Sequence, residues 1–118
     1  SRTNTPLQSL GLLNETQRLE MARSLAARLL QHGQSDRERI NLMFTLIASR
    51  PPEAQEVNVC QKLLDTMRSR YESAPDDARS FLSIGEYQTK DLADLHELAA
   101  WTQLSSTVLA SDLAIMLY

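Results

Sequence analysis

The sequence predicts an all-α protein, a single-domain bundle of about four to six helices. Only three of its 118 residues are Gly and four are Pro, whereas good helix formers such as Leu, Ala, Arg and Glu are abundant. Two helix starts carry capping boxes, and apolar residues recur at helical spacing after each one. A chain of this length can bury a core without a metal or a disulfide, so we expect one domain over residues 1–118.

The first long helix is expected over residues 15–31. Asn14 and Gln17 form a capping box at its start, and the apolar pattern stops at Gly33. A shorter helix is expected before it, beginning with Pro6, because the missing N–H of proline costs nothing at a first helical position. The expected apolar positions of the long helix are Leu19, Ala22, Leu25 or Ala26, and Leu29.

The next two helices are separated by Pro51-Pro52. Ser35 and Glu38 form the capping box that opens the second helix. Pro52 is expected in the first turn of the third, where proline is tolerated. The second helix is expected to bury Ile40, Met43, Phe44 and Ile47, and the third Cys60, Leu63 or Leu64, Met67 and Tyr71. Glu53 and Glu56 complement the positive end of the third helix dipole, and Arg68 and Arg70 the negative end.

A short fourth helix and a long final helix are expected in the remainder. The fourth helix follows Pro75 and ends before Gly85, and residues 86–90 are expected to form a loop. Asp91 can cap the final helix. One stripe of that helix carries Leu95, Leu98, Trp101, Leu104 and Val108, and Leu109, Ile115 and Met116 extend its apolar content.

The charges are distributed unevenly along the chain. Residues 1–50 hold seven Arg and four acids, which gives +3, and residues 51–118 hold five Lys or Arg and eleven acids, which gives −6. The two halves could therefore attract each other. Because the arginines of the first half are interleaved with acids, we interpret this region as solvated helix faces and expect no nucleic acid partner.

The sequence carries neither a membrane-spanning segment nor a secretion leader. No apolar stretch approaches the roughly 20 residues that a spanning helix needs, and no basic-then-apolar leader is present, so no membrane span is expected in this chain. Ser1 stands where an initiating Met would be. We therefore expect the chain to be a fragment excised from a larger protein.

No group of residues forms a catalytic or metal-binding constellation. His96 stands near Asp94 and Glu97, but residues one or two positions apart on a helix face different ways, so we interpret it as a partly exposed polar residue. Cys60 falls on an apolar stripe and is expected to be an inert core thiol. Trp101 is expected to pack in the core rather than bind a ligand. No catalytic residue, metal ligand or cofactor is therefore expected in this chain.

Four short stretches carry a resemblance to a known family. They are Thr3-Asn4-Thr5-Pro6-Leu7-Gln8-Ser9-Leu10 leading to Leu12-Leu13-Asn14, then Ser49-Arg50-Pro51-Pro52-Glu53, Ile84-Gly85-Glu86, and Leu98-Ala99-Ala100-Trp101-Thr102. In this order they resemble landmarks of the planctomycete-specific PSD-one domain, a domain of unknown function. The similarity covers nearly the whole chain.

The resemblance implies a wider context than the residues themselves. Members are C-terminal regions of large planctomycete proteins that are commonly exported and often include a cytochrome c-like module. It therefore implies an exported or periplasmic location, and haem elsewhere in the parent protein. The chain itself has no Cys-x-x-Cys-His motif for attaching a c-type haem. The resemblance supplies no catalytic residues.

Two functions are therefore considered. The first is a non-catalytic helical module for interdomain packing or protein interaction, with neighbouring domains of the parent protein as partners. It predicts an exposed apolar patch. The candidate interaction residues are Leu7, Leu10, Leu12 and Leu13 near the start of the chain, and Leu113, Ile115, Leu117 and Tyr118 near its end. The second is an accessory domain of a larger enzyme in carbohydrate breakdown or redox metabolism, which predicts a concave pocket with His96 or Asp112 at its wall.

Overall fold

The computed structural model describes residues 14–32, 35–83 and 95–116, with side chains up to Ser111. Within these ranges every regular element is a helix, so the predicted all-α class is confirmed. The helices are α2 (Glu15–Gln31), α3 (Asp36–Ala48), α4 (Ala54–Ser73), α5 (Pro75–Leu82) and α6 (Leu95–Met116).

The starts of α2 and α3 confirm both predicted capping boxes. The side chain of Asn14 accepts a hydrogen bond from the Gln17 N–H at 2.8 Å, and the Gln17 side chain accepts one from the Asn14 N–H at 3.1 Å. Ser35 and Glu38 exchange the same two bonds at 3.2 and 3.0 Å. Each box satisfies N–H groups that a helix leaves without partners in its first turn.

The start of α4 differs from the prediction. Pro52 was expected within its first turn, but the helix begins at Ala54, with Glu53 as its extended N-cap residue. The Glu56 carboxylate accepts a hydrogen bond from the Glu53 N–H at 2.8 Å, which fixes the start after the proline pair. The expectation for Pro52 was wrong because this contact places the N-cap one residue beyond it.

Three predicted features lie outside the described residues. They are the short helix beginning with Pro6, the loop over residues 86–90 and the cap at Asp91.

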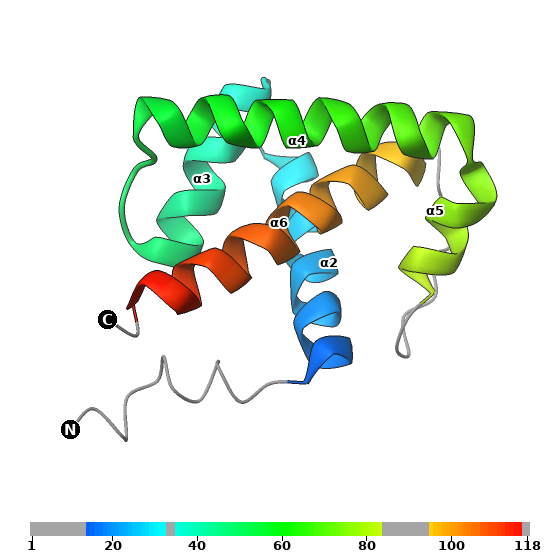
Figure 1. Ribbon diagram of the computed structural model, residues 1–118, viewed down its shortest axis with the longest axis horizontal. Helices are drawn as coiled ribbons and strands as arrows, with labels where there is room; N and C mark the ends of the chain where they lie inside the picture. The colour runs from blue at the N-terminus through cyan, green and yellow to red at the C-terminus, as the bar shows by residue number, and fades with distance from the viewer. Residues whose placement is uncertain (1–13, 33–34, 84–94, 117–118) are drawn as a thin grey trace.

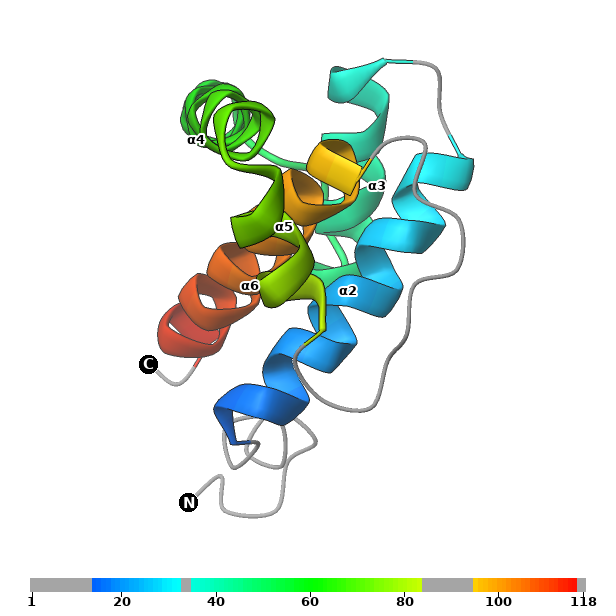
Figure 2. The ribbon, with the colours of Figure 1, turned by 90° about the vertical axis from the view of Figure 1, so that its right-hand side faces the viewer.

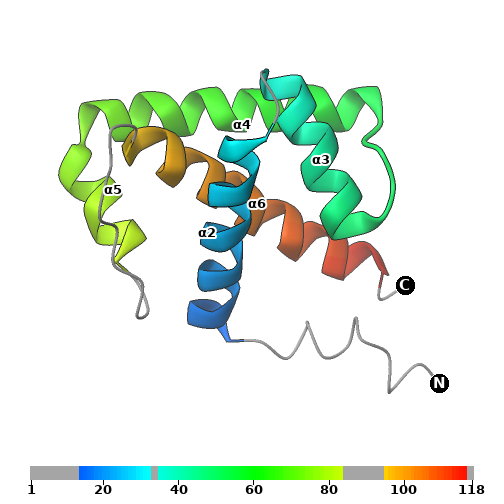
Figure 3. The ribbon, with the colours of Figure 1, turned by 180° about the vertical axis from the view of Figure 1, so that it is seen from behind.

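Helix α6 is the centre of the bundle. It contacts each of the other four described helices. It lies between α4 and α2 (Figure 2), and α2 crosses it when the molecule is seen from behind (Figure 3). Helix α4 runs along one side of the molecule, with α3 near its start and α5 folded back from its end (Figure 1). Residues far apart in the sequence therefore share one core.

The predicted stripe of α6 is buried along its length. Trp101 is fully buried, and the exposed fractions of Leu95, Leu98, Leu104 and Val108 do not exceed 9%. Ala99, Ala100, Thr102 and Ser105 are buried as well, so α6 is covered on several sides, as expected of a helix inside a bundle. No helix in the described part of the chain is both long and apolar enough to cross a lipid bilayer.

Two arginines of the first half complete the ends of other helices. Arg39 donates hydrogen bonds to three carbonyl oxygens at the end of α2, those of Leu29, Leu30 and His32, at 3.1–3.4 Å. Arg23, itself buried, donates to the Leu82 carbonyl at the end of α5 at 3.1 Å. Both contacts supply donors to carbonyl groups in the last turns of these helices, and they place positive charge at the negative ends of helix dipoles.

Candidate functional site

The predicted interaction residues lie outside the side chains that the structure describes. Leu7, Leu10, Leu12 and Leu13 precede the described residues, and Leu117 and Tyr118 follow them. Leu113 and Ile115 lie on the backbone of α6, but their side chains are outside the described part. The surface available for an interaction site is therefore that of the described side chains, up to Ser111.

An apolar groove lies between the first half of α4 and the second half of α6. It has a volume of about 270 Å³, and Phe44 of α3 contributes to its wall. The other residues that line it are Gln55, Glu56, Val59, Cys60 and Leu63 from α4, and Leu104, Thr107, Val108 and Ser111 from α6. Most of these side chains are aliphatic, aromatic or small, so the groove offers an apolar surface.

Val59 makes this groove different from an ordinary gap between helices. Its exposed fraction is 65%, against 38% for Met21 and 39% for Leu46, the other large apolar side chains that are exposed in the described residues. The predicted buried stripe of this helix includes Cys60 and Leu63 or Leu64 but not Val59. A signal was present, because Val59 is four residues before Leu63 and therefore widens the stripe.

The rim of the groove is held by an ion pair. Arg50 forms two parallel hydrogen bonds with the carboxylate of Glu56, at 2.8 and 2.9 Å. The bonds from Arg50 lower the pKa of Glu56 to about 2, assisted by the bond from the Glu53 N–H. The Arg50 guanidinium also lies 5.5 Å from the centre of the Phe44 ring. These contacts tie the turn after α3 to the first turn of α4.

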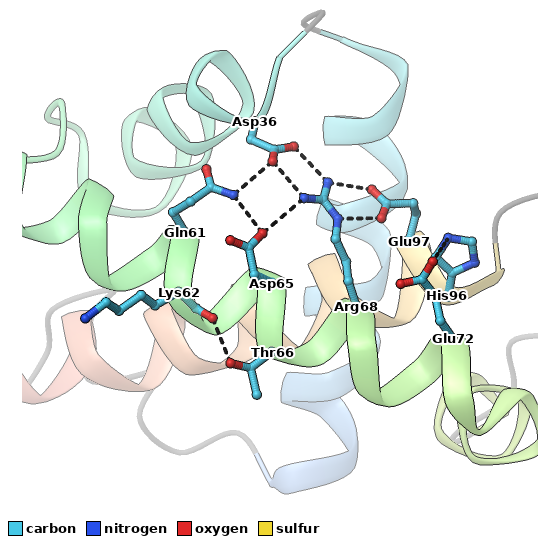
Figure 4. A network of polar contacts seen from close by, with 9 residues as sticks. All are labelled: Asp36, Gln61, Lys62, Asp65, Thr66, Arg68, Glu72, His96 and Glu97. Atoms are coloured by element: carbon cyan, nitrogen blue, oxygen red, sulfur yellow. Dashed lines mark hydrogen bonds and ion pairs between the residues drawn. The ribbon is translucent and has the colours of Figure 1, made fainter.

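A polar cluster surrounds Arg68 in the second half of α4 (Figure 4). Its guanidinium donates to both oxygens of Asp36 at 2.7 and 2.8 Å and to both oxygens of Glu97 at 2.5 and 2.8 Å. Gln61 donates to Asp36 at 3.0 Å and to Asp65 at 3.1 Å. The cluster therefore joins α4 to the first turns of α3 and α6.

The protonation equilibria reflect these contacts. The hydrogen bonds from Arg68 lower the pKa of Asp36, against the opposing effect of burial. The bonds to Asp36 and Glu97 raise the pKa of Arg68. Arg68 was expected only to complement the end of the α4 dipole, but its main contacts are with two other helices. We assign this cluster to the structure of the bundle, because its charged groups bind one another.

A second hollow lies where α4, α5 and α6 meet. It has a volume of about 300 Å³ and is lined by Tyr71, Glu72, Pro75, Leu95 and His96. His96 Nε2 lies 4.0 Å from Glu72 Oε2, with exposed fractions of 34% and 60% for the two side chains. His96 is thus partly exposed, as predicted. No group of three or more His, Cys, Asp or Glu side chains within the described residues could hold a metal ion.

The remaining candidate residues are part of the core. Cys60 is 4% exposed and Trp101 is fully buried, as predicted for both. Thr102 donates its hydroxyl to the Leu98 carbonyl at 2.7 Å, and the Ser105 hydroxyl lies 3.7 Å from the Met43 sulfur. Thr102 and Ser105 of α6 therefore form their contacts within the bundle. The side chain of Asp112 lies outside the described part.

These features define a compact helical module with an apolar groove beside the first half of α4 and a second hollow, which holds the Glu72–His96 pair, at the other end of the same helix. Residues 1–64 match the family model PSD1, a protein of unknown function (DUF1553). Because the match covers more than half of the chain, the protein belongs to this family, and the predicted family is confirmed over residues 1–64. No curated protein and no solved structure gives a significant match to the chain.

Proposed function

We propose that this domain is a helical packing module whose groove between α4 and α6 receives an apolar segment from a neighbouring domain of the parent protein. The observation that carries the proposal is Val59, a β-branched side chain with 65% of its surface exposed beside a groove of about 270 Å³. Exposed apolar surface bordering a hollow is typical of sites where another chain segment packs.

The composition of the groove supports an apolar occupant. Leu63, Leu104 and Val108 line it together with Phe44, and the charged residue at its rim, Glu56, is engaged by Arg50. A segment with two or three apolar side chains would bury this surface. Each Å² of apolar surface removed from water would stabilise the contact by about 25 cal/mol. A strongly charged segment would find no matching charge among these four apolar residues.

The groove also leads towards residues predicted from the sequence. Leu104, Val108 and Ser111 line it at spacings of four and three residues along α6. Position 115 is four residues further on the same helix, whose backbone continues to Met116. Ile115 therefore continues this row of positions. We include Ile115 in the proposed contact, and we keep Leu113, Leu117 and Tyr118, together with Leu7, Leu10 and Leu13, as candidates for a second contact.

Calorimetric titration with the separately produced remainder of the parent protein tests this proposal. Val59→Glu places a charge at the groove and is expected to weaken binding at least about tenfold, because the carboxylate would be desolvated on docking. Leu46→Glu introduces the same charge at an exposed apolar position that does not line the groove, so it should bind like the wild type. Absence of binding, or equal weakening by both variants, would contradict the proposal.

A second candidate is an accessory role in a larger enzyme of carbohydrate breakdown or redox metabolism. It is favoured by one observation, namely that His96 lines a hollow of about 300 Å³. Replacing His96 with Ala in the whole parent protein should then reduce its turnover of substrate without changing the unfolding temperature of the domain. Unchanged turnover would remove the support for this role. An exported location is likewise a proposal, supported by the family resemblance.

A further inference from the structure

The hollow between α4, α5 and α6 contains a pair of polar groups that bind each other only weakly. The His96 Nε2 to Glu72 Oε2 separation is 4.0 Å, whereas the other ion pairs of the described residues are 3.6 Å or shorter. A direct hydrogen bond would require about 2.7–3.2 Å. No other hydrogen bond or ion pair is found for either side chain within the described part of the chain.

The separation fits one bridging atom. A nitrogen or oxygen placed about 2.8 Å from both His96 Nε2 and Glu72 Oε2 would form two hydrogen bonds at an angle of about 90° to each other. This geometry needs no movement of either helix. A metal ion fits less well, because only two protein ligands are present and zinc sites normally have three or four.

The chemistry of the pair favours a donor. Glu72 as a carboxylate only accepts hydrogen bonds, and an imidazole nitrogen that carries no proton accepts as well. An ammonium group can donate to both and also compensates the carboxylate charge. The other lining residues, Tyr71, Pro75 and Leu95, present mainly carbon to the hollow.

One wall of the hollow is fixed by packing. The Tyr71 ring is stacked on Phe81 with 6.0 Å between centroids, and its hydroxyl accepts a hydrogen bond from Gln103 at 3.1 Å. Tyr71 is only 1% exposed, so its position is set by the core. Glu72 follows it directly on α4, so the backbone that carries this carboxylate belongs to a rigid element.

We propose that this hollow binds the primary ammonium group of a small amphiphilic molecule, with the ammonium between Glu72 and His96 and its carbon chain against Pro75 and Leu95. The site is separate from the groove beside Val59. It does not depend on the packing role proposed above, nor on an enzymatic role of the parent protein.

The first test is a titration of the 118-residue chain with n-butylammonium at pH 8, followed by amide chemical shifts. We expect saturable shifts at Glu72 and His96 with a Kd of about 1–10 mM, as suits a ligand of five heavy atoms. The neutral analogue n-butanol and the donor-free tetramethylammonium ion should bind at least about tenfold more weakly. Shifts that rise without saturation, or equal binding of butylammonium and butanol, would overturn the proposal.

Two variants test the assignment to these side chains. Glu72→Gln should weaken butylammonium binding at least about tenfold, since it removes the charge at the site. Asp77→Asn removes one charge from the nearby start of α5 but no residue of the hollow, so it should leave the Kd within about twofold. Equal weakening by both variants would indicate general electrostatic attraction and would reject the site. Thermal unfolding of each variant controls for folding, and Glu72 is exposed enough for its replacement to be tolerated.

Discussion

The two halves of α4 contact the rest of the bundle in different ways. Around Arg68, carboxylates from α3 and α6 converge on one guanidinium. Around Val59, the same helix leaves an apolar groove beside α6. Polar contacts need matched partners at fixed distances, and the chain supplies them itself. Apolar surface can be buried by any apolar neighbour, and the described residues leave part of the apolar surface beside Val59 exposed to solvent.

The largest expected effect concerns Leu64, which lies between these two halves and is fully buried. Leu64→Ala should lower the free energy of unfolding by about 3 kcal/mol, through the lost transfer energy and the cavity left behind. Chemical denaturation measures this change. A loss below about 1 kcal/mol would show that the core around α4 collapses into the cavity. Rigid packing at the centre of α4 would then be excluded.

Replacing the centre of the polar cluster should have the next largest effect. Arg68→Met leaves Asp36 and Glu97 without their cation and should cost about 2 kcal/mol, less than for a fully buried pair because these side chains retain partial access to water. The triple variant with Asp36→Asn and Glu97→Gln should recover part of this loss, because the uncompensated charges are gone. If the triple variant is no more stable than Arg68→Met, repulsion between the carboxylates is not the cause.

Acid should weaken both ends of α4. The pKa values of Asp36 and Glu56 are lower in the folded chain than in the unfolded chain, so protons bind the unfolded chain more tightly. The stability from these groups is present above the unfolded pKa values and is lost as pH falls through the folded ones. For Glu56 this window runs from 4.5 down to about 2. Denaturation measured across this range should give a shallower pH dependence for Glu56→Gln than for the wild type. Equal slopes would contradict the role of Arg50.

The local parts of this fold were predictable from the sequence. Asn14 with Gln17 and Ser35 with Glu38 are residues three positions apart whose hydrogen bonds do not depend on the rest of the molecule. The stripe through Leu98, Trp101 and Leu104 follows directly from the helical period. Local signals therefore sufficed for most described helix positions and for the burial of α6.

The contacts between helices could not be predicted in the same way. Arg68 and Asp36 are 32 positions apart, and no spacing rule links them. Its position near the end of one helix predicts only that Arg68 complements the dipole of that helix, because a single helix contains no information about its neighbours. Glu72 and His96 were likewise joined only by the crossing of α4 and α6. Candidate sites made from several helices therefore emerged only with the tertiary structure.

The smallest expected effect on stability is at Val59. It tests whether the groove is filled by the chain itself or is free to receive a partner. Val59→Glu should change the free energy of unfolding by less than about 0.5 kcal/mol, because the side chain is 65% exposed and Glu favours helix slightly more than Val. Denaturation alongside Leu64→Ala measures the contrast within one helix. A loss above about 1 kcal/mol would mean that Val59 is covered within the chain itself. The groove would then be filled without a partner, and the packing role would have to rest on another surface. A stability near that of the wild type, together with lost binding, would instead show that Val59 contributes to docking and not to the stability of the fold.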